Sequence, residues 1–307
     1  MKRLGAVAAC SVLLVCLHSC ERGEPGPVVE KVRSAQVVGG GELPRSTWSR
    51  VSPEGEFRVS PVWSPSGKRL VVSGRRGLGL FLLTRDGDAE RAVDLEYRGP
   101  RRWQAHPSRD VLCVGADAAQ GLDVDTGEVV ASCSSPPFDD DRGSLVFRDA
   151  NKRIYHHPRR GTVTLLRSGE PTRRIVEHGA WGVRVSASGR RIAWSTGTLS
   201  WAALYVRDLQ ADAAVLVGTG AHPAWLPDGR LLYTVVTAVR RSEGMTHITE
   251  ADLHVYDAST GEVRAVTRTP GVAELQPAVS PDGRSVAFSD WRDGSIYVAP
   301  LGGRALP

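Results

Sequence analysis

The sequence has none of the short motifs that mark the common enzyme mechanisms. Its 307 residues contain no Gly-x-Ser-x-Gly, His-Glu-x-x-His or Cys-x-x-Cys pattern and no phosphate-binding loop, patterns whose spacing places reactive groups together. Aromatic residues amount to only 6%, and 39 basic residues stand against 34 acidic ones, an excess too small for a nucleic-acid surface. These absences favour a binding protein over an enzyme, with no cofactor, no metal and no nucleic-acid partner.

Cysteine is scarce after residue 20. The rest of the chain contains only Cys113 and Cys133. We expect Cys113 on the second strand and Cys133 on the fourth strand of one structural unit. Two strand spacings of ~4.8 Å each exceed the usual reach of a disulfide, although an oxidising compartment permits one. The sequence is compatible with a disulfide between the two residues and with two free thiols.

The apolar run at the N-terminus is too short to cross a membrane. Residues 4–17 follow the basic start Met1-Lys2-Arg3, and a spanning helix needs roughly 20 residues, so the run has the length of a secretory signal peptide instead. It ends in Leu17-His18-Ser19-Cys20, which resembles the lipobox of bacterial lipoproteins. The resemblance implies cleavage after Ser19 and a lipid on Cys20 that anchors the chain in a membrane. An ordinary cleaved signal peptide is the alternative.

The same resemblance implies a location and a division of the chain. Glu21 follows Cys20, so the aspartate that retains lipoproteins in the inner membrane is absent. We therefore expect an outer-membrane lipoprotein that faces the periplasm. Residues 1–19 would be the lipoprotein signal peptide, residues 20–46 the lipidated N-terminus and tether, and residues 47–307 the folded domain.

A repeat of about 40 residues organises the folded part. Each copy has an apolar strand, a tight turn and a second apolar strand, most clearly in residues 61–73, 223–229 and 277–283. The turn recurs at Gly67, Arg109, Asn151, Gly189, Gly229 and Gly283. Alternating apolar pairs follow each turn and indicate a third strand, and hairpin turns such as Thr260-Gly261 lead to a fourth. We therefore predict an all-β fold of six four-stranded antiparallel units, stacked as a six-bladed β-propeller.

The strings Trp-Ser-Pro-x-Gly-Lys-Arg and Pro-Asp-Gly-Arg resemble the WD40-like PD repeat of TolB-type propellers. The resemblance covers about residues 57–301 and implies the propeller, whereas many unrelated functions share this repeat. The last unit ends after its third strand and would leave an unpaired edge. We predict that a strand within residues 47–51 supplies the missing fourth strand and closes the ring.

Two sets of residues are candidate binding sites. In a propeller the residues just before each innermost strand surround the mouth of the central channel, and we call these positions the mouth ring: Ser60, Arg102, Ser144, Gly182, His222 and Gln276. The ring has no carboxylate and a single amide, too few ligands for a hard divalent cation, so we read it as a small polar or anion-binding site. Strand-start residues in contact with water are the alternative.

The loops between second and third strands should lie on the same face as the mouth ring. They carry the basic-loop residues Arg75, Arg76, Arg159, Arg160, Arg240, Arg241 and Arg292. Arginine suits carboxylates and phosphates, although the opposite face is also basic. The fifth unit contains an insertion at about residues 235–251, and a long loop on a rigid scaffold is a common recognition element.

We therefore predict a monomeric, non-enzymatic scaffold, anchored by lipid, that binds an envelope protein through the channel-mouth face and the insertion. The alternative is an enzyme or receptor that handles a small molecule or glycan in the central channel. A captured protein partner would favour the first function, and an ordered channel ligand the second.

Overall fold

The computed structural model of this chain describes residues 37–40, 43–75, 78–87, 90–94, 101–104, 110–114, 120–126, 128–132, 144–211, 213–242 and 245–301. Among these residues the regular structure is almost entirely β, with short 3-10 turns such as η1 (Arg45–Thr47) and η3 (Leu199–Trp201). No helix in the described ranges has the length and apolar character of a membrane span. Cys20 and Cys133 lie outside these ranges, so lipidation and the disulfide stay predictions.

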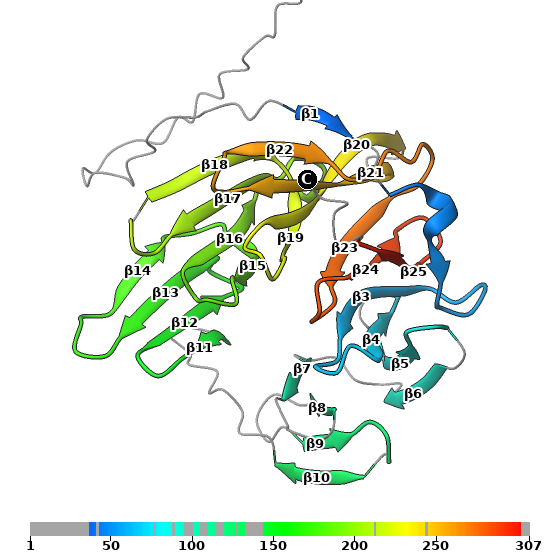
Figure 1. Ribbon diagram of the computed structural model, residues 1–307, viewed down its shortest axis with the longest axis horizontal. Coiled ribbons are helices and arrows are strands. Elements are labelled where there is room, and N and C mark those ends of the chain that lie inside the picture. Colours follow the sequence, from blue (N-terminus) through cyan, green and yellow to red (C-terminus); the bar gives the residue numbers. More distant parts are fainter. Residues whose placement is uncertain are drawn as a thin grey trace, which may run out of the picture.

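The strands form antiparallel sheets that follow one another along the chain (Figure 1). The first two sheets contain β3 (Arg58–Trp63), β4 (Arg69–Gly74), β5 (Leu80–Thr84) and β6 (Glu90–Asp94), then β7 (Arg101–Gln104), β8 (Val111–Val114), β9 (Gln120–Asp123) and β10 (Val129–Ser132). The third and fourth contain β11 (Ser144–Arg148), β12 (Lys152–His157), β13 (Thr162–Arg167) and β14 (Arg173–Val176), then β15 (Trp181–Val185), β16 (Arg191–Thr196), β17 (Ala203–Asp208) and β18 (Ala213–Thr219).

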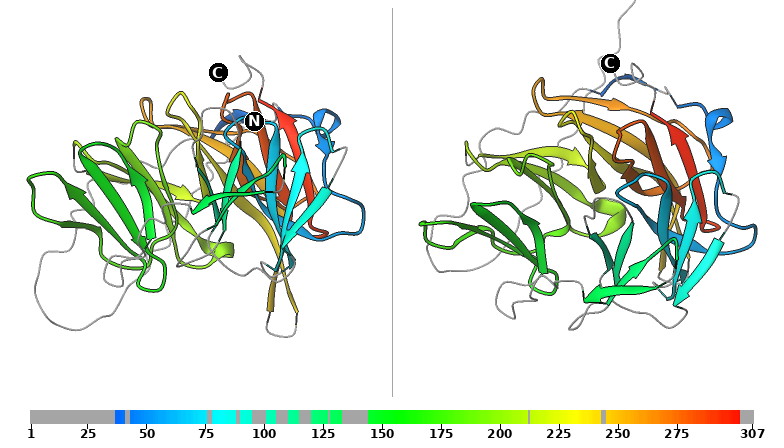
Figure 2. Two further views of the ribbon diagram at one scale, coloured as in Figure 1. Left: turned by 90° about the horizontal axis from the view of Figure 1, so that it is seen from below. Right: turned by 60° about the horizontal axis from the view of Figure 1, so that its bottom comes forward.

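The last two sheets include strands from the N-terminal part of the chain. One contains β19 (Ala221–Trp225), β20 (Leu231–Ser242), β21 (Met245–Asp257) and β22 (Glu262–Ala265), with β1 (Val37–Gly40) added in parallel beside β22. The other contains β23 (Glu274–Val279), β24 (Ser285–Asp290) and β25 (Ser295–Pro300), with β2 (Ser49–Arg50) as its outer strand. The sheets lie around a common centre as blades of a β-propeller (Figure 2).

The predicted number of four-stranded blades is wrong. The structure has five four-stranded blades rather than six, because the sheet built on β19–β22 carries β1 as a fifth strand. Residues 37–40 and the buried Leu43 fall in the range predicted as a tether, yet Leu43 packs in the core between β21 and β24. The added strand covers an edge that would otherwise be open to pairing with another chain.

The predicted closing strand is confirmed. β2 pairs antiparallel with β25, with Ser49 opposite Val298 and Arg50 opposite Tyr297. The backbone N–H of Val51 then donates to the carbonyl of Ile296 at 2.9 Å. Two segments almost 250 residues apart in the sequence thus share one sheet, and the last blade has its fourth strand.

Buried apolar side chains fill the spaces between neighbouring blades. Leu82 and Leu112 meet between the first two sheets, and Leu232 and Phe288 between the sheets of β19–β22 and β23–β25. Such clusters arise because alternating residues of each strand face opposite sides of the sheet. The clusters join the sheets of β11–β14, β15–β18, β19–β22 and β23–β25 and the sheet of β3–β6 in turn, which holds β3, β15, β19 and β23 in fixed positions around the channel.

Candidate functional site

Four mouth-ring residues share a rare backbone conformation. Ser60, Gly182, His222 and Gln276 have φ of 54°, 61°, 51° and 57°. Each lies where the pairing of an innermost strand with its neighbour shifts register, at a β-bulge. Bulges redirect side chains and are common beside functional sites. The sequence placed these four residues at equivalent positions, and the structure shows that the equivalence extends to their dihedral angles.

The conformation is costly for the three ring residues that have a Cβ. Ser60, His222 and Gln276 are the non-glycine residues with positive φ in the described part of the chain, and a side chain in this region costs roughly 1–3 kcal/mol. A proline follows each of them, which fixes the next φ. Strain that recurs at three equivalent positions indicates that the surrounding blades hold these side chains in place.

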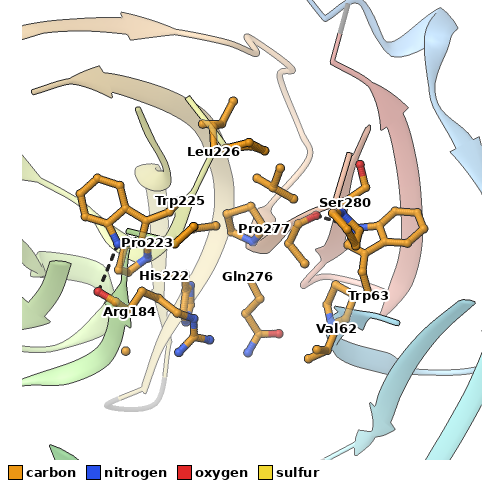
Figure 3. A pocket seen from close by; sticks show the side chains of 18 of the residues that line it. Val62, Trp63, Arg184, His222, Pro223, Trp225, Leu226, Gln276, Pro277 and Ser280 are labelled. Carbon is orange, nitrogen blue, oxygen red and sulfur yellow. Dashed lines mark hydrogen bonds between the residues drawn. The ribbon is translucent and has the colours of Figure 1, made fainter. Parts of the chain in front are cut away.

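The ring residues border a cavity of about 550 Å³ in the central channel. Its walls are the innermost strands β3, β15, β19 and β23. Most lining residues are apolar, among them Trp63, Trp225 and Leu226. The side chains of Arg184, His222 and Gln276 extend together toward one end (Figure 3). The cavity therefore has a polar end at the start of the innermost strands and an apolar end beyond it.

Arg184 is the residue of this site that sequence reasoning missed. It lies two positions after Gly182 on β15, where the corresponding residues of β3, β19 and β23 are Val62, Ala224 and Ala278. Its side chain is accessible to water, and Nη1 donates to the carbonyl of Val183 at 3.0 Å. The signal was present in the sequence, because Arg184 is the one charged residue among the six equivalent positions.

The charge of Arg184 has no acidic counterpart in the cavity. The lining residues include no aspartate or glutamate, and no ion pair of Arg184 occurs within the described ranges. The surrounding strands partly desolvate the guanidinium and lower its pKa, although the side chain is open to water in the channel. It stays charged at neutral pH. The polar end of the channel is therefore positively charged.

A tryptophan from the next blade holds the backbone of Arg184. Trp225 Nε1 donates to the carbonyl of Arg184 at 3.1 Å, and Trp63 Nε1 donates to the equivalent carbonyl of Ala278 at 2.9 Å (Figure 3). The tryptophan of the repeat thus links adjacent innermost strands. This bond fixes the position from which the Arg184 side chain extends.

His222 is neutral at physiological pH. Its ring meets the ring of Trp181 edge to face with centroids 5.6 Å apart. Burial, and then the positive charge of Arg184, lowers the pKa of His222 to about 4. Nδ1 is buried without a partner in the described structure. A buried polar atom without a partner costs stability, so the imidazole has capacity for a further hydrogen bond.

Gln276 joins two blades and presents its amide to the channel. Its Oε1 accepts a hydrogen bond from the Ser60 backbone N–H at 2.8 Å and a longer one from Ser289 Oγ at 3.4 Å. These bonds assign the oxygen, so the NH₂ group is the end left for other partners. Gln276 therefore supplies a neutral donor beside the Arg184 charge.

The structure brings together only part of the predicted mouth ring. Ser60, Gly182, His222 and Gln276 line the cavity, whereas Ser144, at the start of β11, does not. Arg102 lies on β7, but its side chain is outside the described part. Ser144 also lacks the positive φ of its counterparts, which explains why its side chain is not directed as theirs are.

The predicted basic-loop residues differ in their surroundings. Arg75, Arg159, Arg160 and Arg240 are exposed. Arg292 is instead held by the buried Asp290, with Nε–Oδ1 and Nη2–Oδ2 distances of 3.1 and 2.7 Å. Arg76 and the side chain of Arg241 lie outside the described residues. Arg292 is also exposed, but its charge is balanced by the buried carboxylate of Asp290.

The loops between second and third strands define one face of the molecule, which we call the mouth face. Strand register places them there, because Gly74, Ser195 and Asp290 near the ends of β4, β16 and β24 pair with residues at the starts of innermost strands. The hairpin of β20 and β21 extends from the same face, since Thr234 pairs with Ala221 beside His222. The insertion predicted at residues 235–251 is this long hairpin.

Large apolar side chains are exposed on the mouth face. Trp201 is 67% exposed at the end of η3, Trp291 is 37% exposed after β24, and Leu78 is 36% exposed before β5. Each lies in a loop between second and third strands. Leu199 of η3 packs against the base of the β20–β21 hairpin. The hairpin is thereby joined to the loop that carries Trp201.

An aromatic and arginine cluster extends this surface. The rings of Phe57 and Trp291 meet edge to face with centroids 6.2 Å apart, and the Arg75 guanidinium lies 5.7 Å from the Phe57 ring centroid. Tryptophan and arginine are enriched at the energetic centres of protein interfaces. The mouth face thus combines residue types that favour protein binding.

Within the described ranges no three histidine, cysteine, aspartate or glutamate side chains form a group that could hold a metal ion. The same ranges contain no serine or cysteine arranged with a histidine and an acid in the channel. The arrangement offers one cation, one neutral imidazole and one amide. These groups can bind and orient an anion.

Comparison with known proteins supports the fold. No model of a protein family matches the chain, and no curated protein matches it. A gluconolactonase from Xanthomonas campestris is similar, with a TM-score of 0.53 and 14% identity over 82% of this chain and 88% of that one. A putative TolB from Agrobacterium tumefaciens matches with a TM-score of 0.47 and 15% identity, over 80% of this chain and 91% of that one.

TolB from Acinetobacter baumannii gives a TM-score of 0.40 and 15% identity over 80% of this chain and 64% of that one. The chain therefore spans less than two thirds of that protein's length. At such identities the likeness concerns the fold alone. The blades described above, together with the likeness to the gluconolactonase, identify the chain as a β-propeller. Its function has to be argued from the site.

Proposed function

We propose that this chain is a lipid-anchored protein of the bacterial envelope whose propeller is a non-enzymatic scaffold that binds a protein partner on the mouth face. The observation that carries the proposal is the exposure of Trp201 and Trp291 on the face from which the β20–β21 hairpin projects. Exposed aromatic side chains grouped on one face mark interaction sites, and burying a tryptophan supplies a large share of binding energy.

The partner would present an acidic surface. Arg75, Arg159, Arg160 and Arg240 are exposed on the mouth face, and complementary charge raises the association rate and selects partners. Arg58 of the same face is already paired with Glu56 at 3.1 Å, so the proposal does not rest on it. Orientation by a lipid on Cys20, in the outer membrane and facing the periplasm, would place the monomeric propeller among envelope proteins.

Trp201→Ala combined with Arg240→Ala is expected to reduce capture of the protein partner at least tenfold. Both side chains are exposed, so their removal takes away interface contacts while the core is unchanged. The measurement is affinity capture from detergent-solubilised envelopes with quantitative mass spectrometry. Arg148→Ala with Arg153→Ala is the matched control, because both are exposed at the opposite ends of their strands. Equal recovery by both variants and the unchanged protein would refute the mouth face as the binding surface.

Cys20→Ser is expected to abolish incorporation of labelled palmitate and to move the protein from the membrane fraction to the soluble fraction. The acyl chains are the proposed source of membrane affinity, since each buried CH₂ contributes ~0.8 kcal/mol. Cys16→Ser is the matched control and should keep both label and location. A Cys20→Ser protein that stays labelled and sedimented would exclude this lipid site.

A receptor or enzyme that uses the channel is the second candidate. The uncompensated charge of Arg184 in a cavity of about 550 Å³ favours ligand binding there. No described group in the cavity is a nucleophile activated by a base. The binding part of this alternative is developed below, and it is compatible with a scaffold that uses the outer loops.

A further inference from the structure

The polar end of the channel holds a positive charge that the described structure does not balance. Among the described residues that line the cavity, Arg184 is the one arginine or lysine, and none is a carboxylate. Its Nη1 donates to the carbonyl of Val183, on its own strand. A guanidinium has five N–H donors in a planar fork, so most of its hydrogen-bonding capacity faces the cavity or water.

Two uncharged groups lie beside this charge. Gln276 uses Oε1 to accept from Ser60, which leaves its NH₂ group available. His222 carries a buried Nδ1 without a partner in the described part of the chain. Both side chains extend to the same end of the cavity as Arg184 (Figure 3). The blades hold all three in place, through the bulges at His222 and Gln276 and the Trp225 bond to the Arg184 carbonyl.

We propose that this end of the channel binds the carboxylate of a small organic molecule, with Arg184 as its charged anchor and Gln276 and His222 as neighbouring hydrogen-bond partners. The planar fork of arginine matches the two oxygens of a carboxylate. A single cation with neutral partners balances a single negative charge. A phosphate would carry more charge than these groups neutralise, and a metal cation would be repelled by Arg184.

The walls of the rest of the cavity select the part of the ligand that is attached to the carboxylate. Prolines 61, 223 and 277 and the side chains of Trp63, Val62 and Leu226 line the remaining walls. A volume of about 550 Å³ lies within the range of small-molecule sites, and such sites are usually apolar with a few polar groups that orient the ligand. The ligand class is therefore a monocarboxylate with an apolar or aromatic body.

His222 takes part in binding as a neutral hydrogen-bond partner. Burial lowers its pKa to about 4, Arg184 on β15 is the charged group that acts on this imidazole, and His156 on β12 is the other titratable group beside Arg184. The imidazole and a carboxylate ligand therefore both keep their charge state between pH 7 and 5.5. We expect the Kd to be unchanged across this range.

The test uses phenylacetate as the probe and the full mature chain in detergent. Binding is followed by the indole N–H signals of Trp63 and Trp225, because both side chains line the cavity. We expect saturable shifts with a Kd in the millimolar range, and binding of the neutral analogue phenylacetamide at least tenfold weaker. No saturable shift up to 50 mM phenylacetate, or equal affinities for the two probes, would overturn the proposal.

Arg184→Gln is expected to weaken phenylacetate binding at least tenfold. Arg184→Lys keeps the positive charge and should weaken binding less. Arg153→Gln removes the same charge from an exposed position outside the cavity and should leave the Kd unchanged. An Arg184→Gln variant that melts like the unchanged protein and binds as tightly would overturn the proposal. Arg184 is not among the mouth-face residues changed in the capture experiment. A channel that does not bind phenylacetate would therefore leave the scaffold proposal standing, and a failed capture experiment would leave the channel proposal standing.

Discussion

Deletion of residues 28–51 is expected to abolish cooperative unfolding of the propeller. The deleted segment contains β1, β2 and three packed side chains: Leu43 and Val51 are buried, and Trp48 contacts the Phe288 ring with centroids 4.8 Å apart. Burial of a Leu or Val side chain stabilises by about 1.5–3 kcal/mol, and Trp48 adds a larger apolar area. The sum is comparable with the 5–15 kcal/mol that stabilises a typical domain.

The deletion also exposes an edge. Without β2, the backbone groups of β25 that pair with Ser49 and Arg50 lose their partners, and an open β-strand favours aggregation. The matched control is deletion of residues 28–36, which ends before β1 begins at Val37. Calorimetry or urea unfolding followed by circular dichroism measures both variants. A protein lacking residues 28–51 that still unfolded cooperatively at the original Tm would refute the closure by β2.

Glu274→Gln is expected to stabilise the protein increasingly as pH rises from 4.5 to about 8, and so to flatten the dependence of its stability on pH. Glu274 is fully buried at the start of β23, and Thr267 Oγ1 donates to its Oε2 at 2.5 Å. Its Oε1 is buried without a partner in the described structure. Burial, with a smaller contribution from the neighbouring Asp252, raises the pKa of this carboxyl to about 8. The folded protein therefore holds the proton at neutral pH.

The direction of the change in stability with pH follows from the linkage between protonation and folding. The unfolded carboxyl has a pKa of 4.5, so below that pH both states are protonated and the contribution of Glu274 is fully present. As pH rises from 4.5 through about 8, the unfolded state ionises first and gains free energy. The loss is on the order of 4 kcal/mol by pH 9. Glutamine resembles the protonated acid and does not titrate, so the variant avoids this loss.

Urea unfolding of both proteins at pH 5, 7 and 9 measures the effect. The difference in free energy of unfolding should be small at pH 5 and favour Glu274→Gln by several kcal/mol at pH 9. His254, whose pKa is lowered by burial to about 4, contributes stability above pH 6.5 that is lost as pH falls through about 4. Because both proteins contain His254, its effect cancels in the comparison.

Glu262→Gln is the control for Glu274→Gln, since Glu262 is exposed and only pairs with Arg264. It should not change the slope of stability with pH. A Glu274→Gln variant destabilised equally at every pH would show that the carboxyl is ionised in the folded protein.

The blade architecture was predictable because its determinants are local. The turns at Gly67, Gly189, Gly229 and Gly283 have positive φ, as the sequence predicts for this position. Asn151, at the equivalent turn position, does not have a positive φ. Alternation along each strand indicated which residues face the neighbouring blades, and the register shows them there. The addition of β1 was not predictable, because it depends on pairing with β22 across more than 220 residues.

The sequence predicted where the candidate site lies better than it predicted which residues form it. Counting back from each repeat turn found Ser60, His222 and Gln276, since equivalent positions in a repeat occupy equivalent places in the structure. The same counting included Ser144, which does not line the cavity, and passed over Arg184, which does. A β-bulge shifts the direction of side chains by one residue, so counting alone could not tell which positions face the channel.

The sequence by itself determined that this chain forms four-stranded β-units and placed equivalent residues beside one channel. Turn residues and the two-residue alternation act over a few neighbours, so the sequence displays them directly. Only the tertiary structure decided that no described carboxylate lines the cavity beside Arg184, that Asp290 pairs with Arg292, and that β1 makes one blade five-stranded. Each depends on which distant side chains and strands come together, and that is settled by the packing of whole blades.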